Sequence, residues 1–163
     1  MLTALTPHRA AYIVFAATAA TLIGAWIFEY LGYAPCDLCL KQRWAYYAAI
    51  PLSLVLALSA SNNPSLTRNG LYLLALIMFG SAVFGVYHAG VEWKWWAGPG
   101  TCSGDGGLTG GLPDLTKPAV MCDEAAIRVL GLSLAGWNAV ISAATAIVAL
   151  MGAASQGSSS VSQ

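Results

Sequence analysis

The sequence carries little charge. Of its 163 residues only 9% are charged, whereas 58% are hydrophobic, and the mean hydropathy is +0.66. Soluble domains have about 25% charged residues, so this composition excludes an ordinary soluble domain. Basic and acidic residues balance at seven each, and we expect no nucleic-acid partner. Histidine is also scarce, and none follows Cys39 directly, which excludes attachment of a c-type haem.

Four apolar stretches are each close to the ~20 residues that cross a bilayer core. They cover roughly residues 10–31, 44–60, 70–89 and 132–152. The first is longer than the ~7–15-residue apolar core of a signal peptide. We therefore predict an all-α membrane protein, a four-transmembrane-helix bundle that forms one domain over residues 1–163. The predicted loops are 32–43 and 90–131, and a disordered tail is predicted at 153–163.

The orientation of these spans is not settled by charge. Four spans place both cysteine-containing loops on one side and both termini on the other. Five of the seven basic residues lie on the cysteine side, which by the positive-inside rule would place the cysteines in the cytoplasm. Paired cysteines outside the membrane core instead favour an oxidising compartment. We therefore expect the cysteine loops outside the cytoplasm.

Cys36-Asp37-Leu38-Cys39 is a CxxC pair, which forms a tight and exchangeable disulfide. A helix is expected to begin within or just after it, and the positive end of a helix favours the reactive thiolate. Arg43, four residues after Cys39, would share its helix face and lower the thiol pKa. The alternatives are a static disulfide or a zinc site. Structural zinc sites typically use two CxxC-like pairs, which this chain lacks, so we expect no metal.

The second pair, Cys102 and Cys122, lies in the long loop, and seven glycines occupy residues 98–111. A disulfide between them could simply staple the loop, at about 3 kcal/mol of stabilisation. The glycines, however, make the chain around Cys102 deformable. Such a loop suits cysteines that exchange partners.

His88 and Glu92 stand four residues apart at the end of the third apolar stretch. Ionisable groups at membrane depth are functional candidates, and His88 could hydrogen-bond a polar head group. The alternative for Glu92 is an interfacial position, which we also expect for Glu29. The other histidine, His8, is predicted across the membrane, which excludes haem held by two histidines on one face.

Small residues recur at helical spacing in two of the stretches. They are Ala16, Ala20 and Gly24 in the first and Ser81, Gly85 and Ala89 in the third. Because small residues let membrane helices approach closely, both stripes are predicted to be helix–helix contacts.

Together these features resemble the DsbB family of bacterial inner-membrane thiol–quinone oxidoreductases. The resemblance rests on four spans, on Pro35-Cys36-Asp37-Leu38-Cys39, on Arg43 and on the paired cysteines of the second outer loop. It implies an enzyme, a protein-disulfide:quinone oxidoreductase. The enzyme would reoxidise a periplasmic DsbA-like protein of thioredoxin fold and reduce ubiquinone or menaquinone. We expect a monomer in contact with membrane lipid, multi-pass in the bacterial inner membrane, with the cysteine loops periplasmic.

The resemblance also implies roles for the cysteines. Cys36 and Cys39 would be the pair next to the quinone, with Cys39 forming the thiolate–quinone charge-transfer species and Arg43 supporting it. Cys102 and Cys122 would reoxidise the soluble partner.

His88 and Glu92 look like positions of the quinone pocket, although the family commonly has glutamine where Glu92 stands. The family's prototype has a short membrane-lying helix between the loop cysteines. The Gly- and Pro-rich segment Ser103–Pro118 does not favour that helix here.

Two other functions fit parts of the sequence. A thiol–quinone enzyme of the vitamin K epoxide reductase type would be expected to carry its CxxC on the last helix. A non-catalytic tetraspan membrane protein would use the four cysteines as two structural disulfides. Bound quinone and a reducible CxxC would separate an enzyme from such a scaffold.

Overall fold

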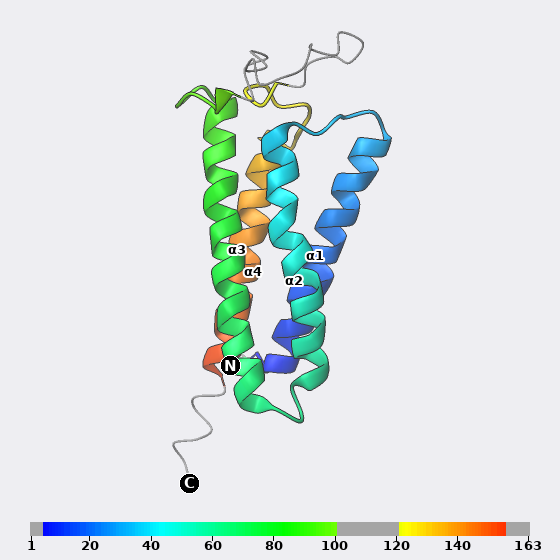
Figure 1. Ribbon diagram of the computed structural model, residues 1–163, viewed down its shortest axis with the longest axis vertical. Helices are drawn as coiled ribbons and strands as arrows, with labels where there is room; N and C mark the ends of the chain where they lie inside the picture. The colour runs from blue at the N-terminus through cyan, green and yellow to red at the C-terminus, as the bar shows by residue number, and fades with distance from the viewer. Residues whose placement is uncertain (1–4, 101–120, 156–163) are drawn as a thin grey trace, which may run out of the picture.

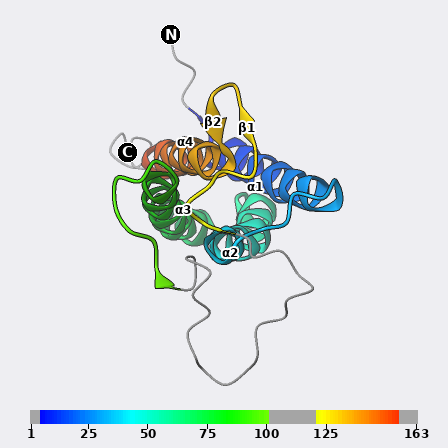
Figure 2. The same ribbon diagram turned by 90° about the horizontal axis from the view of Figure 1, so that it is seen from above.

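The computed structural model describes residues 5–100 and 121–155, which form four helices and a short β-hairpin. Consecutive helices run in opposite directions, as in an up-and-down bundle (Figure 1), and α4 closes the bundle against α1 (Figure 2). The elements are α1 (Pro7–Tyr30), α2 (Asp37–Ser59), α3 (Pro64–Glu92), β1 (Arg128–Val129), β2 (Leu132–Ser133) and α4 (Leu134–Ala154).

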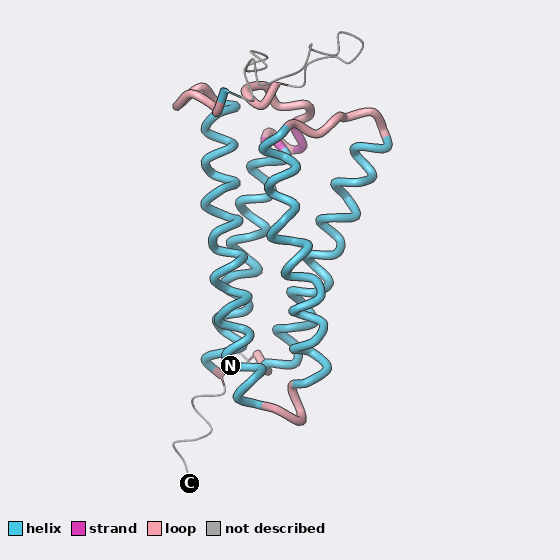
Figure 3. The backbone as a smooth tube through the Cα atoms, in the orientation of Figure 1, coloured by secondary structure: helices cyan, strands magenta, loops and turns pink. Residues whose placement is uncertain are grey.

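One end of the bundle carries the cysteines. The tube in Figure 3 shows the α1–α2 loop, the segment after α3 and the segment before α4 at the same end. The chain termini and the α2–α3 turn lie at the opposite end. Cys36, Cys39 and Cys122 are therefore gathered at one end, as the sequence predicted.

Three helices, α1, α3 and α4, are long and apolar enough to cross a membrane, among the described residues. The protein is thus a multi-pass membrane protein, and the predicted all-α bundle is confirmed. Helix α2 has 23 residues, but it does not reach the same hydropathy. Polar residues in its first turns, among them Asp37, Lys41 and Arg43, lower its average. Of the four predicted spans, three are therefore confirmed as candidate membrane helices.

The helices extend beyond the apolar stretches that predicted them. Helix α2 extends the apolar stretch of residues 44–60 back to Asp37, inside the CxxC, as the motif predicted, and the Cys36 side chain caps it by accepting the Cys39 backbone N–H. Helix α3 begins at Pro64 instead of residue 70, since proline is favoured in a first helical turn. Helix α4 ends at Ala154, within the tail predicted from residue 153. The remainder of that tail, residues 156–163, lies outside the described residues.

One of the two predicted stripes of small residues is a packing surface. Ser81 and Gly85 are buried in α3, and a Cβ on Gly85 would lie 2.8 Å from the backbone nitrogen of Ala139 in α4. Only glycine permits this approach. The prediction that the stripe in α1 is a helix–helix contact was wrong, because Ala16 and Ala20 are exposed. Helix α1 instead buries its neighbouring face, which contains Ala11, Val14, Thr18 and Leu22.

A buried polar network joins three helices below the cysteine end. The Tyr46 hydroxyl donates to Asn138 Oδ1 at 2.5 Å and lies 2.9 Å from Ser142 Oγ. Ser142 Oγ in turn donates to Ser81 Oγ at 3.0 Å. Hydrogen bonds between membrane helices fix their relative positions, since an unpaired polar group in an apolar core is costly. The network thereby holds α2, α3 and α4 in one register.

Candidate functional site

The cysteine pair opens α2. Cys36 is the N-cap residue and is 5% exposed, whereas Cys39 is half-buried one turn later. Both thiols are free, their sulfurs lie 2.7 Å apart, and the Cys39 backbone N–H donates to Cys36 Sγ at 3.2 Å. The helical turn therefore places the two sulfurs for reversible disulfide formation.

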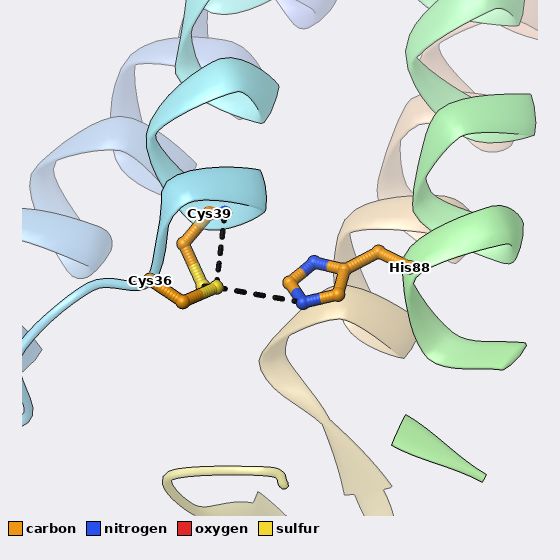
Figure 4. Close-up of side chains that lie close together, drawn as sticks. All are labelled: Cys36, Cys39 and His88. Carbon is orange, nitrogen blue, oxygen red and sulfur yellow. Dashed lines mark hydrogen bonds between the residues drawn. The ribbon is translucent and has the colours of Figure 1, made fainter. Parts of the chain in front are cut away.

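His88 reaches this pair from α3 (Figure 4). Its Nε2 lies 3.5 Å from Cys36 Sγ, and its Nδ1 lies 3.1 Å from Gln42 Nε2 on α2. With the Gln42 amide donating to Nδ1, the ring proton of a neutral His88 is on Nε2, facing the sulfur. Gln42 was not predicted from the sequence. Its spacing of three residues from Cys39 was the available signal, because such residues share a helix face.

A cavity of about 330 Å³ lies on the other side of α2, between α1, α2, α4 and the hairpin. Cys39, Gln42 and Arg43 contribute to its wall. Arg43 is 12% exposed and its Nη1 donates to Glu29 Oε2 at 2.7 Å. The structure thus gives Glu29, expected to be merely interfacial, a specific partner. The other lining residues are Thr21, Leu22, Gly24, Ala25, Phe28, Tyr33, Ala34, Pro35, Tyr46, Ala126, Val129, Leu134, Ala135, Trp137, Asn138 and Ile141.

The hairpin beside this cavity was not predicted. Leu130 and Gly131 form its turn with φ values of 52° and 85°, as the favoured two-residue hairpin turns require. The Trp137 indole N–H donates to the Val129 carbonyl at 2.9 Å and fastens the hairpin to α4. Gly131 was the only turn signal in a short apolar sequence.

Cys36 and Cys39 face different surroundings. Cys39 lines the cavity, whereas Cys36 belongs to a buried cluster with Leu38, Val91 and Cys122. Cys122 is 1% exposed and is disulfide-bonded. Cys102, its expected partner, lies outside the described residues. The structure therefore brings a cysteine of the second pair against the CxxC.

His88 and Glu92 lie on the Cys36 side of the pair. Glu92 Oε1 is 3.8 Å from His88 Nε2, and the two side chains are 6% and 1% exposed, respectively. Neither residue lines the cavity. Their expected place in a quinone pocket remains a prediction, but their observed neighbour is the Cys36 thiol.

Sequence comparison identifies the family. The family model for disulfide bond formation protein DsbB matches residues 7–152. The chain belongs to the DsbB family. It is 30% identical over 147 residues to disulfide bond formation protein B of an Azoarcus species, covering 84% of this chain and 86% of the relative. It is 27% identical over 148 residues to the protein of that name from Albidiferax ferrireducens, covering 83% and 81%. No solved structure matches the chain.

Membership of the DsbB family confirms the resemblance and identifies the chain as a membrane protein that takes part in disulfide bond formation. It also favours a redox role for the cluster of Cys36, Cys39 and His88. Their ligand atoms lie within 4.8 Å of one another. Closed structural zinc sites use four protein ligands, and the described residues offer three here. We therefore assign the cluster to thiol chemistry.

The surroundings of Cys36 favour its ionised form. The hydrogen bond from the Cys39 thiol, followed by the contact with His88, lowers the pKa of Cys36 from 9.0 to about 5, although burial opposes this change. In the reduced pair, Cys36 is therefore the thiol whose ionisation is favoured. The DsbB resemblance assigns the quinone-side thiolate to Cys39, and that role remains a prediction.

Proposed function

We propose that the protein oxidises a periplasmic dithiol protein of thioredoxin fold and passes the two electrons to a membrane quinone. The observation that supports this most strongly is the position of the CxxC. Cys36 packs in the same buried cluster as Cys122, and Cys39 lines an apolar cavity. Thiol–disulfide exchange can therefore take place at Cys36, while electrons pass to an acceptor in the cavity from Cys39.

The cavity fits a quinone head group. Its volume of about 330 Å³ lies within the range of about 300–1,000 Å³ typical of small-molecule sites. Its wall is mostly apolar, as a ring system requires, and Arg43 and Gln42 supply N–H donors for carbonyl oxygens. When bound, ubiquinone or menaquinone would supply an acceptor for two electrons and two protons. Arg43 and Cys39 would hold the head group.

The chain's own residues prepare both sulfurs. The His88 Nε2–H stabilises a thiolate on Cys36 once the pair is reduced. Arg43, fixed by Glu29, places a cation in the wall that Cys39 shares. The buried position of Cys36 keeps the thiol of a folded protein from attacking it directly.

The reaction can be tested with purified protein, a reduced DsbA-type donor and quinone. We expect quinone absorbance to fall by one equivalent for each donor disulfide formed, and Cys39→Ser to abolish this reaction. Cys36 and Cys39 should also be reducible by the donor. A CxxC that resists the donor, with no quinone consumed, would favour the structural scaffold over the enzyme. The vitamin K epoxide reductase type is not favoured, because the CxxC opens α2 and not the last helix.

We further propose that α2 crosses the bilayer and that both cysteine loops face the periplasm of the inner membrane. Its 23 residues extend ~35 Å at about 1.5 Å per residue. Helix α2 also runs antiparallel beside α1 and α3 (Figure 1). Its charged residues are confined to its first turns at the cysteine end. Four crossings then place both cysteine loops on one side.

Thiol labelling in intact cells tests this orientation. In a variant whose four native cysteines are replaced, Lys94→Cys introduces an exposed thiol at the cysteine end and Ser61→Cys one at the opposite end. A membrane-impermeant maleimide is expected to label Lys94→Cys in intact cells and Ser61→Cys only after lysis. The reverse pattern would overturn the orientation and the periplasmic partner with it.

A further inference from the structure

Glu92 is a buried carboxylate that the proposed reaction does not yet use. Its side chain is 6% exposed, and its Oε2 has no hydrogen-bond partner among the described residues. A buried carboxylate with one oxygen unpaired is costly, so such a group is usually neutral or close to a cation. An ionisable residue at this depth therefore points to proton handling.

Only the side chain of His88 separates Glu92 from the reacting sulfur of Cys36. Glu92 Oε1 lies 3.8 Å from His88 Nε2, and the same nitrogen lies 3.5 Å from Cys36 Sγ. Gln42 holds the opposite ring nitrogen, so the single imidazole proton stands between the sulfur and the carboxylate. His88 thus connects the two acids of the site.

The surrounding charges favour states in which either the Cys36 thiol or the Glu92 carboxyl group is ionised, but not both. Besides His88 on α3, the Ser133 hydroxyl before α4 hydrogen-bonds Glu92, and the charges of Cys36, Cys39 and Arg128 act on the same carboxyl group. A thiolate on Cys36 and a carboxylate on Glu92 repel each other, and the low dielectric of the interior strengthens the repulsion. Ionisation of Cys36 is therefore coupled to protonation of Glu92.

We propose that Glu92 takes up the proton of Cys36 when the Cys36–Cys39 disulfide is reduced and gives it up when that disulfide re-forms. The proposal rests on the proposed function. The incoming dithiol delivers two electrons and two protons as the S–S bond breaks. One proton stays on Cys39 and the other resides on Glu92, leaving Cys36 a thiolate that His88 Nε2–H holds. When the electron pair leaves for the quinone and the S–S bond re-forms, both protons leave with it to complete the quinol.

Infrared difference spectroscopy of the full-length protein tests this without quinone. Reduction by dithiothreitol is expected to produce the carbonyl-stretch band of a protonated carboxylic acid. The band should be missing in Glu92→Gln and retained in Glu124→Gln, which removes an exposed carboxylate. Glutamine has almost the same shape as glutamate and carries no charge, so Glu92→Gln is expected to fold. Absence of the band in the unmodified protein, or its persistence in Glu92→Gln, would overturn the proposal.

The pH dependence of Cys36 alkylation provides a second readout. With Glu92 present, two coupled ionisations should broaden the profile of the reduced protein. Glu92→Gln should give a single ionisation whose midpoint is about one pH unit lower, because the repulsion is removed. Identical profiles would contradict the proposal. Normal quinone turnover without the infrared band would refute only the proton role, whereas the band without quinone turnover would refute only the proposed function.

Discussion

Replacing Cys122 by serine is expected to stop turnover, because it removes the loop disulfide that the soluble partner attacks. Cys36 is 5% exposed and Cys122 is 1% exposed, so a folded protein partner has no direct access to either sulfur. Its thiolate should therefore attack Cys102, breaking the loop disulfide and releasing Cys122 as a thiolate. Cys122 lies in the Cys36 cluster and would attack Cys36, expelling Cys39. Without Cys122 there is no loop disulfide for the partner to attack, so electrons do not reach Cys36.

The point of entry is mapped by non-reducing electrophoresis with a DsbA-type donor that keeps only its attacking cysteine, because such a donor cannot resolve the mixed disulfide that it forms. We expect this donor to form an adduct with the unmodified protein and with Cys36→Ser, but not with Cys102→Ser or Cys122→Ser, which lack the loop disulfide. Each exchange step transfers one disulfide and requires only in-line access between sulfurs. An adduct that maps to Cys36 would reverse the order of the relay and make the loop pair structural.

The helices could be predicted from the sequence because hydropathy reports the same transfer free energy that inserts them into lipid. Hydropathy did not report where they begin. The start of α2 at Asp37 was predicted from the CxxC motif and depends on the Cys36 cap, whereas the start of α3 depends on Pro64 and was missed. The stripe of Ala16 and Ala20 failed for a related reason. Alanine is equally compatible with lipid and with a neighbouring helix, so spacing alone does not identify the buried face of α1.

The site was predicted where its signal is local. The CxxC, Arg43 and the neighbouring pair His88 and Glu92 can be recognised from short spacings. The contact between Gln42 and His88 joins residues 46 positions apart, and no local pattern encodes it. The same holds for the packing of Cys122 against the Cys36 cluster and for the cavity beneath the hairpin. These contacts depend on how α2, α3 and α4 are arranged around one another.

Arg43→Ala is expected to lower kcat/KM for quinone about tenfold or more while leaving the fold intact. Arg43 is the cation in the cavity wall beside Cys39, and removal of a preorganised charged donor slows charge transfer to a bound acceptor. The loss of its ion pair with Glu29 should cost little stability, about 0–1 kcal/mol, because Glu29 is 44% exposed. Steady-state quinone reduction at limiting quinone measures the effect, with thermal unfolding as the check on the fold.

Three further variants separate charge from position. Arg43→Lys should restore only part of the rate, since a compact ammonium cannot reproduce the planar donor geometry of guanidinium. Glu29→Gln should lower the rate less than Arg43→Ala, because it loosens the guanidinium and leaves its charge in place. Lys41→Ala is the matched control, as Lys41 pairs with Asp37 on the exposed side of the same helix, and its rate should be unchanged. If Arg43→Ala retained full kcat/KM at limiting quinone, Arg43 would have no part in quinone reduction. The assignment of the cavity as the quinone site would then lose the polar residue that chiefly supports it.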